Sequence, residues 1–161
     1  MDNDLTTLAN NYGIASKIPI YLYINSNGGF IYAANKAIDC IAELNNPIYT
    51  VAHGMVASAA TLLLVVGTKR FIKPNGYLLL HELSNGAWHG GLEEFKDNTM
   101  HYRELMKIIK DMYIKNSKLT SKQLDRILKH DAIWDATESI KYGLVDKVYY
   151  ESHESQSKPK K

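Results

Sequence analysis

The sequence predicts an α/β fold with a mainly parallel sheet, and three observations support this prediction. Segments with strand patterns alternate with segments with helical patterns along the 161 residues. The first strand candidate, residues 18–24, is apolar almost throughout, which is typical of a parallel strand covered on both faces. No repeat or linker interrupts the alternation, so we expect a single domain at residues 1–150, followed by a disordered tail at residues 151–161.

Turn residues divide the first half of the chain into alternating elements. A polar, glycine-rich stretch at residues 25–29 ends the first strand, Pro47 follows the first helix, and Gly67 stops the second helix. The elements expected between these breaks are the strand 18–24, the helix 32–44, the strand 48–52, a turn at His53 and Gly54, and the apolar helix 58–66.

Capping patterns mark the helices of the second half. Thr120 and Gln123 have capping-box spacing, Asp135 and Glu138 stand in the same relation, and Gly143 is placed to end the last helix. Apolar residues recur at helical spacing before them, over residues 92–116. The expected elements are the strands 69–72 and 77–81, a loop at 84–91, the helix 92–116, helices starting at Thr120 and Asp135, and a strand at 144–150.

Composition and charge argue against nucleic-acid and membrane partners. The formal net charge is +2 and the basic residues are scattered, so no basic stripe is available to an anionic polymer or membrane. The longest apolar stretch, residues 57–67, is about half the length needed to cross a bilayer. The single cysteine, Cys40, lies in a helical apolar pattern and has no partner for a disulfide, so we expect it to be buried and the protein to be cytoplasmic.

Ser58 is the first candidate for chemistry. It stands between a glycine turn and the start of an apolar helix, with small neighbours that let another backbone approach closely. The free N–H groups of that helix start could stabilise an oxyanion formed beside a serine nucleophile. Taken alone, however, these residues fit a helix N-cap better than a nucleophile.

The glycine pair Gly28 and Gly29 is the second candidate. It lacks both the Lys-Ser/Thr pair and the third spaced glycine of phosphate-binding loops. Two interpretations stay open, which are an ordinary turn between strand and helix and a turn whose N–H groups hold an oxyanion and an extended peptide.

His81 is the third candidate, because catalytic groups gather where parallel strands end. A histidine at such a place is nevertheless more often structural. Asp131, Asp135 and Asp146 could each orient its imidazole. Asp135 has a local role as a cap and Asp146 lies beyond the glycine stop, so Asp131 is favoured. None of the six histidines pairs with another at metal-ligand spacing, and we expect no metal site.

Four sequence blocks stand in one order along the chain. They are Tyr23-Ile24-Asn25-Ser26-Asn27-Gly28-Gly29, Gly54-Met55-Val56-Ala57-Ser58, Lys69-Arg70 with Pro74-Asn75 and His81, and Ala136-Thr137-Glu138-Ser139-Ile140-Lys141-Tyr142-Gly143-Leu144-Val145-Asp146. In this order and at this spacing they resemble the Clp protease proteolytic subunit (ClpP) family over residues 18–150. The resemblance implies the ClpP/crotonase fold, in which βαβ turns stack and a long helix, here residues 92–116, protrudes.

The resemblance also implies a serine-protease site. Ser58 would be the nucleophile, His81 the general base, and Asp131 the acid that orients the imidazole. The backbone N–H groups of Gly29 and Ala59 would form the oxyanion hole. An extended substrate would pair with the backbone near Phe30, Ile31, Leu83, Ser84 and Asn85.

The implied activity is that of a serine endopeptidase that cleaves unfolded polypeptides through an acyl-enzyme, without a cofactor. The implied assembly is a homo-oligomer of stacked heptameric rings enclosing a chamber. An AAA+ unfoldase is an implied partner, but only 17 residues precede Ile18, where family members carry an axial hairpin that contacts it, so the sequence leaves this partner open. The helical stripe of Phe95, Leu105, Ile109 and Met112 would pack ring against ring or belong to the chain's own core.

Two substitutions depart from the family pattern, since Asn27 and Leu83 stand where the family has prolines. The alternative of another class is a non-catalytic structural ring subunit, which loss of the three site residues would mark; all three are present. An acyl-CoA enzyme of the crotonase type would have no need of Ser58, His81 and Asp131 together. A Ser–Lys peptidase would need Lys69 or Lys73 beside the serine, and both lie on the wrong side of a turn.

Overall fold

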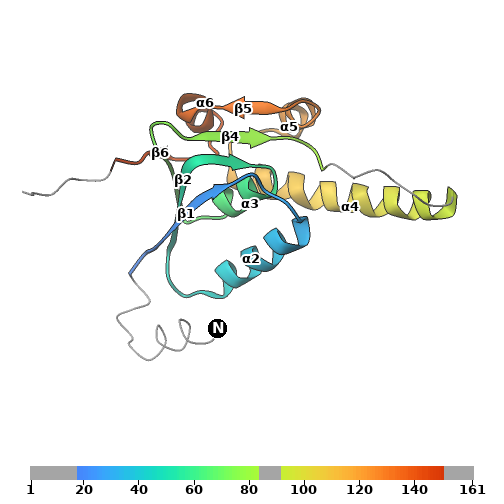
Figure 1. The fold of residues 1–161 in the computed structure, drawn as a ribbon, viewed down its shortest axis with the longest axis horizontal. Helices are drawn as coiled ribbons and strands as arrows, with labels where there is room; N and C mark the ends of the chain where they lie inside the picture. The colour runs from blue at the N-terminus through green and yellow to red at the C-terminus, as the bar shows by residue number, and fades with distance from the viewer. Residues whose placement is uncertain (1–17, 84–91, 151–161) are drawn as a thin grey trace, which may run out of the picture.

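A six-stranded sheet forms the centre of the protein (Figure 1). The computed structural model describes residues 18–83 and 92–150. The elements are β1 (Ile20–Ser26), α2 (Ile31–Glu43), β2 (Ile48–Ala57), α3 (Ala59–Val65), β3 (Lys69–Ile72), β4 (Tyr77–Leu80), α4 (Leu92–Asn116), α5 (Ser121–Ile127), β5 (Ala132–Trp134), α6 (Ala136–Lys141) and β6 (Lys147–Val148). All strand pairs are parallel except β4 with β5, so the predicted α/β fold with a mainly parallel sheet is confirmed.

Strand β2 is the organising strand, because β1, β3 and β4 all pair with it. Its first half pairs with β3 and its second half with β4. The predicted turn at His53 and Gly54 is wrong, since both residues lie inside β2. Gly54 instead forms an irregularity within the strand, with a φ of 89°, and the Asn25 side chain accepts a hydrogen bond from the N–H of Met55 beside it, at 3.3 Å.

Strand β5 was not predicted from the sequence. It has three residues and pairs antiparallel with β4. Three residues are too few to show a strand periodicity, and the sequence pattern shows only a connection between two helices. The last strand, β6, also covers only part of the predicted range 144–150.

Helix α2 corrects the expectation for Cys40, which is exposed rather than buried. The inner face of α2 carries Ile31 and Ala34, both buried, and Ile38, which packs against the core. Cys40 is two residues beyond Ile38, about 200° around the helix, so it faces away from the core. The helix was predicted correctly, but Cys40 was assigned to its buried face and lies on its exposed face.

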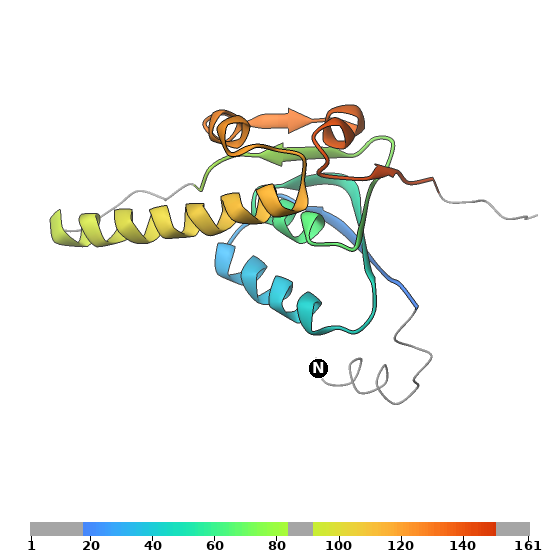
Figure 2. The same ribbon diagram turned by 180° about the vertical axis from the view of Figure 1, so that it is seen from behind.

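Helix α4 has a packed half and a protruding half. Met106, Ile109 and Tyr113 are buried against the core, whereas Phe95 and Met100 are 53% and 62% exposed. Figures 1 and 2 both show the first turns of α4 extending beyond the rest of the described chain. The stripe on this helix therefore belongs to the chain's own core only in its second half. Within residues 18–83 and 92–150, no helix combines the length and apolarity that a membrane crossing requires.

The predicted helix caps in the second half are confirmed. Thr120 and Gln123 exchange both hydrogen bonds of a capping box at the start of α5. At the start of α6 only the N-cap half of the predicted pair forms: the Asp135 side chain accepts a hydrogen bond from the N–H of Glu138 at 2.9 Å, whereas the Glu138 carboxylate pairs with Lys141. Gly143 has a φ of 72°, as a residue that ends a helix does. Asp131 and β5 lie between α5 and the capped start of α6.

Candidate active site

Ser58 joins β2 to α3 in a strained conformation. Its φ is 54° and its ψ is −130°. Among the described residues it is the only one besides glycines with a positive φ. It occupies the N-cap position of α3, but its side chain makes no capping hydrogen bond. The serine hydroxyl is thus not used in capping, and backbone strain of this kind, roughly 1–3 kcal/mol, is characteristic of functional positions.

The glycine turn after β1 lies directly against Ser58. Gly28 has a φ of 88°. A Cβ atom on Gly28 would lie 2.6 Å from the carbonyl oxygen of Ala57, 2.8 Å from Cβ of Ser58 and 3.0 Å from the backbone nitrogen of Ala59. Only glycine fits both this conformation and this space. Residues 28 and 58 are therefore held in contact although 30 positions separate them in the sequence.

Two backbone N–H groups lie close to this contact. Ala59 is the first residue of α3, where the helix leaves its N–H groups without intrahelical partners. The N–H groups of Gly29 and Ala59 have no hydrogen-bond partner in residues 18–83 and 92–150. Both residues line one pocket of about 180 Å³, which Phe30, Ala33 and Leu63 help to close. The predicted oxyanion residues are thus brought together, with donors available.

Ser58 and His81 line one small cavity. The N–H of Ser58 donates a hydrogen bond to the carbonyl oxygen of Leu79 at 2.9 Å. Strand β4 therefore holds the serine backbone through Leu79, and His81 follows two residues after Leu79. Both side chains are half-buried. The cavity also contains two predicted substrate-binding residues, Ile31 and Leu83.

His81 and Asp131 lie just beyond the paired ends of β4 and β5. Leu80 pairs with Ala132 in antiparallel register, and His81 and Asp131 are the next residues outward on the two strands. The N–H of Glu82 donates to the carbonyl oxygen of Leu128 at 2.9 Å, so the chain after His81 contacts the end of α5 and does not continue the regular pairing with β5. Asp131 itself is exposed.

The competing acids are engaged elsewhere. Asp135 caps α6, and Asp146 forms an ion pair with Arg70, with 2.6 Å between Oδ1 and Nη2. In the described part of the chain, the side chains of Ser58, His81 and Asp131 form no hydrogen bonds with one another. The fold therefore places Ser58 and His81 at one cavity and Asp131 one residue before β5, without a hydrogen-bonded line between the three side chains.

The predicted substrate-binding residues do not all lie at the same cavity. Ile31 is buried and Leu83 is half-buried, and they line the cavity of Ser58 and His81. Phe30 is 87% exposed and lines the pocket of Gly29. Ser84 and Asn85 lie outside the described residues.

Two hydroxyl groups near Ser58 were not predicted. Tyr113 lies on the packed half of α4, lines the cavity of Ser58 and His81, and forms a short hydrogen bond with the Thr61 hydroxyl. Burial raises the pKa of the Tyr113 hydroxyl to about 12, so it is neutral at physiological pH. The sequence indicated only that Tyr113 lies within the apolar helical pattern of residues 92–116. A contact between residues 52 positions apart leaves no local pattern.

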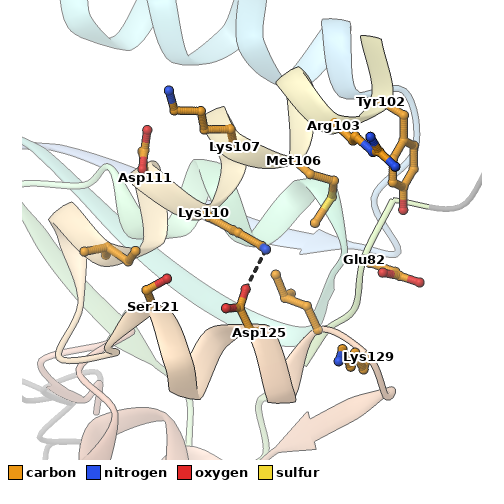
Figure 3. A pocket seen from close by; sticks show the side chains of 12 residues that line it. Glu82, Tyr102, Arg103, Met106, Lys107, Lys110, Asp111, Ser121, Asp125 and Lys129 are labelled. Atoms are coloured by element: carbon orange, nitrogen blue, oxygen red, sulfur yellow. Dashed lines mark hydrogen bonds and ion pairs between the residues drawn. The ribbon is translucent and has the colours of Figure 1, made fainter. Parts of the chain in front are cut away.

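A larger hollow of about 600 Å³ lies between α4 and α5 (Figure 3). Charged side chains of both signs surround it, and Lys110 and Asp125 form an ion pair across it at 2.5 Å. Neither Ser58 nor His81 lines this hollow, although Glu82, the residue after His81, does. Within the described ranges, no three His, Cys, Asp or Glu side chains gather as a metal site would require.

Comparison with known proteins assigns the chain to a family. The family model of Clp protease matches residues 5–152. The chain belongs to the Clp protease family. A proteolytic subunit 2 of the ATP-dependent Clp protease from Leifsonia xyli is 33% identical over 132 residues, which cover 80% of this chain. A proteolytic subunit 2 from Treponema denticola is 33% identical over 135 residues, and a proteolytic subunit from Deinococcus radiodurans is 30% identical over 138 residues, covering 81% and 84% of this chain.

The Clp protease relatives are longer than the aligned region. The chain spans 59% of the Leifsonia subunit, 66% of the Treponema subunit and 67% of the Deinococcus subunit. The predicted ClpP fold is confirmed by this membership, and the α/β architecture with a mostly parallel sheet agrees with it.

Proposed function

We propose that this chain is a serine endopeptidase subunit of the ClpP type, with Ser58 as nucleophile, His81 as general base and Asp131 as the orienting acid. One observation carries the proposal. Ser58 sits in a strained turn with a glycine backbone pressed against it, and it shares a cavity with His81. Membership of the Clp protease family supports the same conclusion. It also disfavours the acyl-CoA enzyme considered from the sequence.

The proposed reaction begins with a peptide carbonyl beside Ser58. His81 accepts the hydroxyl proton as the serine oxygen attacks the carbonyl carbon, and a tetrahedral intermediate forms. The N–H groups of Gly29 and Ala59 would stabilise its oxyanion, and loss of one such donor costs roughly 3 kcal/mol of barrier. His81 then donates the proton to the departing amine, and an acyl-enzyme remains. Water, activated by His81, hydrolyses that ester and regenerates Ser58.

Asp131 would hold the His81 imidazole in the tautomer that leaves one ring nitrogen free to accept the serine proton. Its negative charge would also stabilise the imidazolium that forms. The position of Asp131 next to the last β4–β5 pair, Leu80 with Ala132, supports this role, because His81 follows Leu80. Catalytic hydrogen bonds are often open in substrate-free proteins and tighten on binding, so open side-chain geometry is compatible with the proposal.

Assembly into a ring chamber forms part of the proposal. Phe95, Met100 and Ile108 on α4 are each at least half exposed, and a second copy would cover such side chains. In that arrangement the peptidase sites would face an enclosed space, and only unfolded polypeptide could reach them. The relatives' names describe an ATP-dependent protease, so an ATPase partner is a further part of the proposal.

The test is covalent labelling with a fluorophosphonate probe, which reacts with activated serines. Native protein at concentrations that allow assembly is expected to take one label, mapped by mass spectrometry to Ser58. The variant Ser58→Ala is expected to take none, since it lacks the nucleophile. The matched control is Ser121→Ala, which removes an exposed serine of α5 and should keep the full label.

Each outcome separates the proposed peptidase from the structural subunit. Label on native protein that disappears after denaturation or in Ser58→Ala supports the peptidase. An assembled wild-type particle that takes no label contradicts the proposal and favours the non-catalytic ring subunit.

A further inference from the structure

Both peptide groups that flank Ser58 are held by hydrogen bonds. Its N–H donates to the carbonyl oxygen of Leu79 at 2.9 Å. Its carbonyl oxygen accepts two hydrogen bonds from Thr61, one from the N–H at 2.9 Å and one from the hydroxyl at 2.6 Å. Since a carbonyl oxygen has two lone pairs, its capacity is filled. The strained φ of Ser58 is thus fixed from both sides.

The hydroxyl hydrogen bonds beyond Ser58 have a determined direction. Thr61 has a single hydroxyl proton, which it donates to the carbonyl oxygen of Ser58. The Thr61 hydroxyl also bonds to the Tyr113 hydroxyl, so Tyr113 must be the donor in that bond. The two hydrogen bonds therefore form a relay, in which Tyr113 donates to Thr61 and Thr61 donates to Ser58, and each bond polarises the next.

The relay begins on α4, the helix whose first half protrudes. Thr61 and Tyr113 are 0% and 2% exposed, so water cannot replace either partner. The same helix also reaches the segment after His81, because the Tyr102 hydroxyl donates to the carbonyl oxygen of Leu83. Helix α4 therefore contacts both the start of α3, next to Ser58, and the segment that follows His81.

We propose that Thr61 and Tyr113 are positioning residues, which hold the Ser58 carbonyl and so keep the serine in its strained conformation at the cavity that it shares with His81. Through this relay, the packing of α4 against α3 determines how reactive the Ser58 hydroxyl is. The inference rests on the proposed function, since it assigns a role in the reactivity of Ser58. It goes beyond that function by naming residues outside the triad and the oxyanion hole.

Thr50 provides a matched control for a purely structural role. It is another threonine that is 0% exposed, and its hydroxyl donates to a carbonyl of the same helix, that of Leu64, at 2.7 Å. That carbonyl lies near the far end of α3 from Ser58. Thr50→Val and Thr61→Val thus each remove a buried hydroxyl group that donates to a carbonyl at one end of α3.

The experiment compares the variants Thr61→Val, Tyr113→Phe, the double variant, Thr61→Ser and Thr50→Val. Two quantities are measured for each, namely the second-order rate constant of fluorophosphonate labelling at Ser58 and the free energy of unfolding in urea. We expect labelling to fall about tenfold in Thr61→Val and about threefold in Tyr113→Phe, which are the losses that one hydrogen bond and one polarising partner produce. Thr61→Ser keeps the hydroxyl and should label at close to the wild-type rate.

The double variant separates reactivity from stability. Thr61→Val leaves the buried Tyr113 hydroxyl without its partner, and adding Tyr113→Phe removes that orphaned group. The double variant should therefore regain stability while its labelling stays about tenfold low. Thr50→Val should lose stability and label at the wild-type rate.

Two results would overturn the inference. One is wild-type labelling in Thr61→Val and in the double variant. The other is labelling that follows stability across the whole set, Thr50→Val included. Either result leaves the proposed function standing, provided that the wild type is labelled at Ser58. A wild type that takes no label instead refutes the proposed function, and the inference with it.

Discussion

Replacing Asp131 with asparagine is expected to lower kcat about 10⁴-fold with little change in KM. An amide in place of the carboxylate would favour the wrong tautomer of His81 and would no longer stabilise the imidazolium, while leaving the size of the side chain unchanged. Because Asp131 is exposed and makes no hydrogen bond in the described residues, the variant should fold normally. Hydrolysis of a fluorogenic peptide by wild type and variant, at equal concentration of assembled protein, measures the effect.

The two other acids near the end of the chain serve as controls. Asp135→Ala removes the cap of α6 and should lower the free energy of unfolding by about 1 kcal/mol, with kcat unchanged. Asp146→Asn weakens the ion pair with Arg70 and should likewise leave kcat unchanged. If Asp131→Asn kept full activity while one of these variants lost it, the assignment of the acid would be wrong.

Gly28→Ala should lower kcat by about 10²-fold or more and destabilise the fold at the same time. The positive φ of Gly28 disfavours any side chain by roughly 1–2 kcal/mol. The new methyl group would also lie 2.6 Å from a backbone carbonyl oxygen and 2.8 Å from Cβ of Ser58. The turn must therefore shift away from Ser58 and carry Gly29 with it, and a displacement of about 1 Å in a catalytic group costs about 10²-fold.

Gly143→Ala is the matched control for this substitution. Gly143 also has a positive φ, 72°, and a Cβ atom there would lie 3.0 Å from the backbone nitrogen of Lys118. It lies beyond α6, outside the cavity of Ser58 and His81. Both alanine variants should unfold at lower urea concentration, and only Gly28→Ala should also lose turnover per folded molecule. Equal losses of turnover in the two would show that the close contact at Ser58 has no catalytic importance.

The elements with strong local signals were predicted well, and those defined by long-range pairing were not. The range of α4 matches its predicted bounds because its apolar period and length are unambiguous. The continuation of β2 through Gly54 was missed, because a glycine after a histidine indicates a turn unless neighbouring strands are known. Strand β5 was missed because its three residues are extended only by pairing with β4.

The candidate site shows the same division. Ser58 and His81 stand at element ends, which sequence patterns locate, and the structure places them in one cavity. The choice of Asp131 depended on eliminating other acids and on the family resemblance, whereas its position beyond the last β4–β5 pair, next to His81 in the register, depends on the pairing of β5. The partnership of Thr61 with Tyr113 depends on how α4 packs on α3, and a single sequence does not encode that packing in any local pattern.

The attachment of α4 at one end divides its residues between two thermodynamic roles. Substitutions in its packed half, such as at Ile109, act on the folding equilibrium of each subunit, because they remove buried contacts. Substitutions near Phe95 leave that equilibrium almost untouched, since the side chain is in water before and after folding of one subunit. In the proposed assembly, such substitutions would instead change the free energy of association between copies. Mutations along this one helix are therefore separable by their dependence on protein concentration.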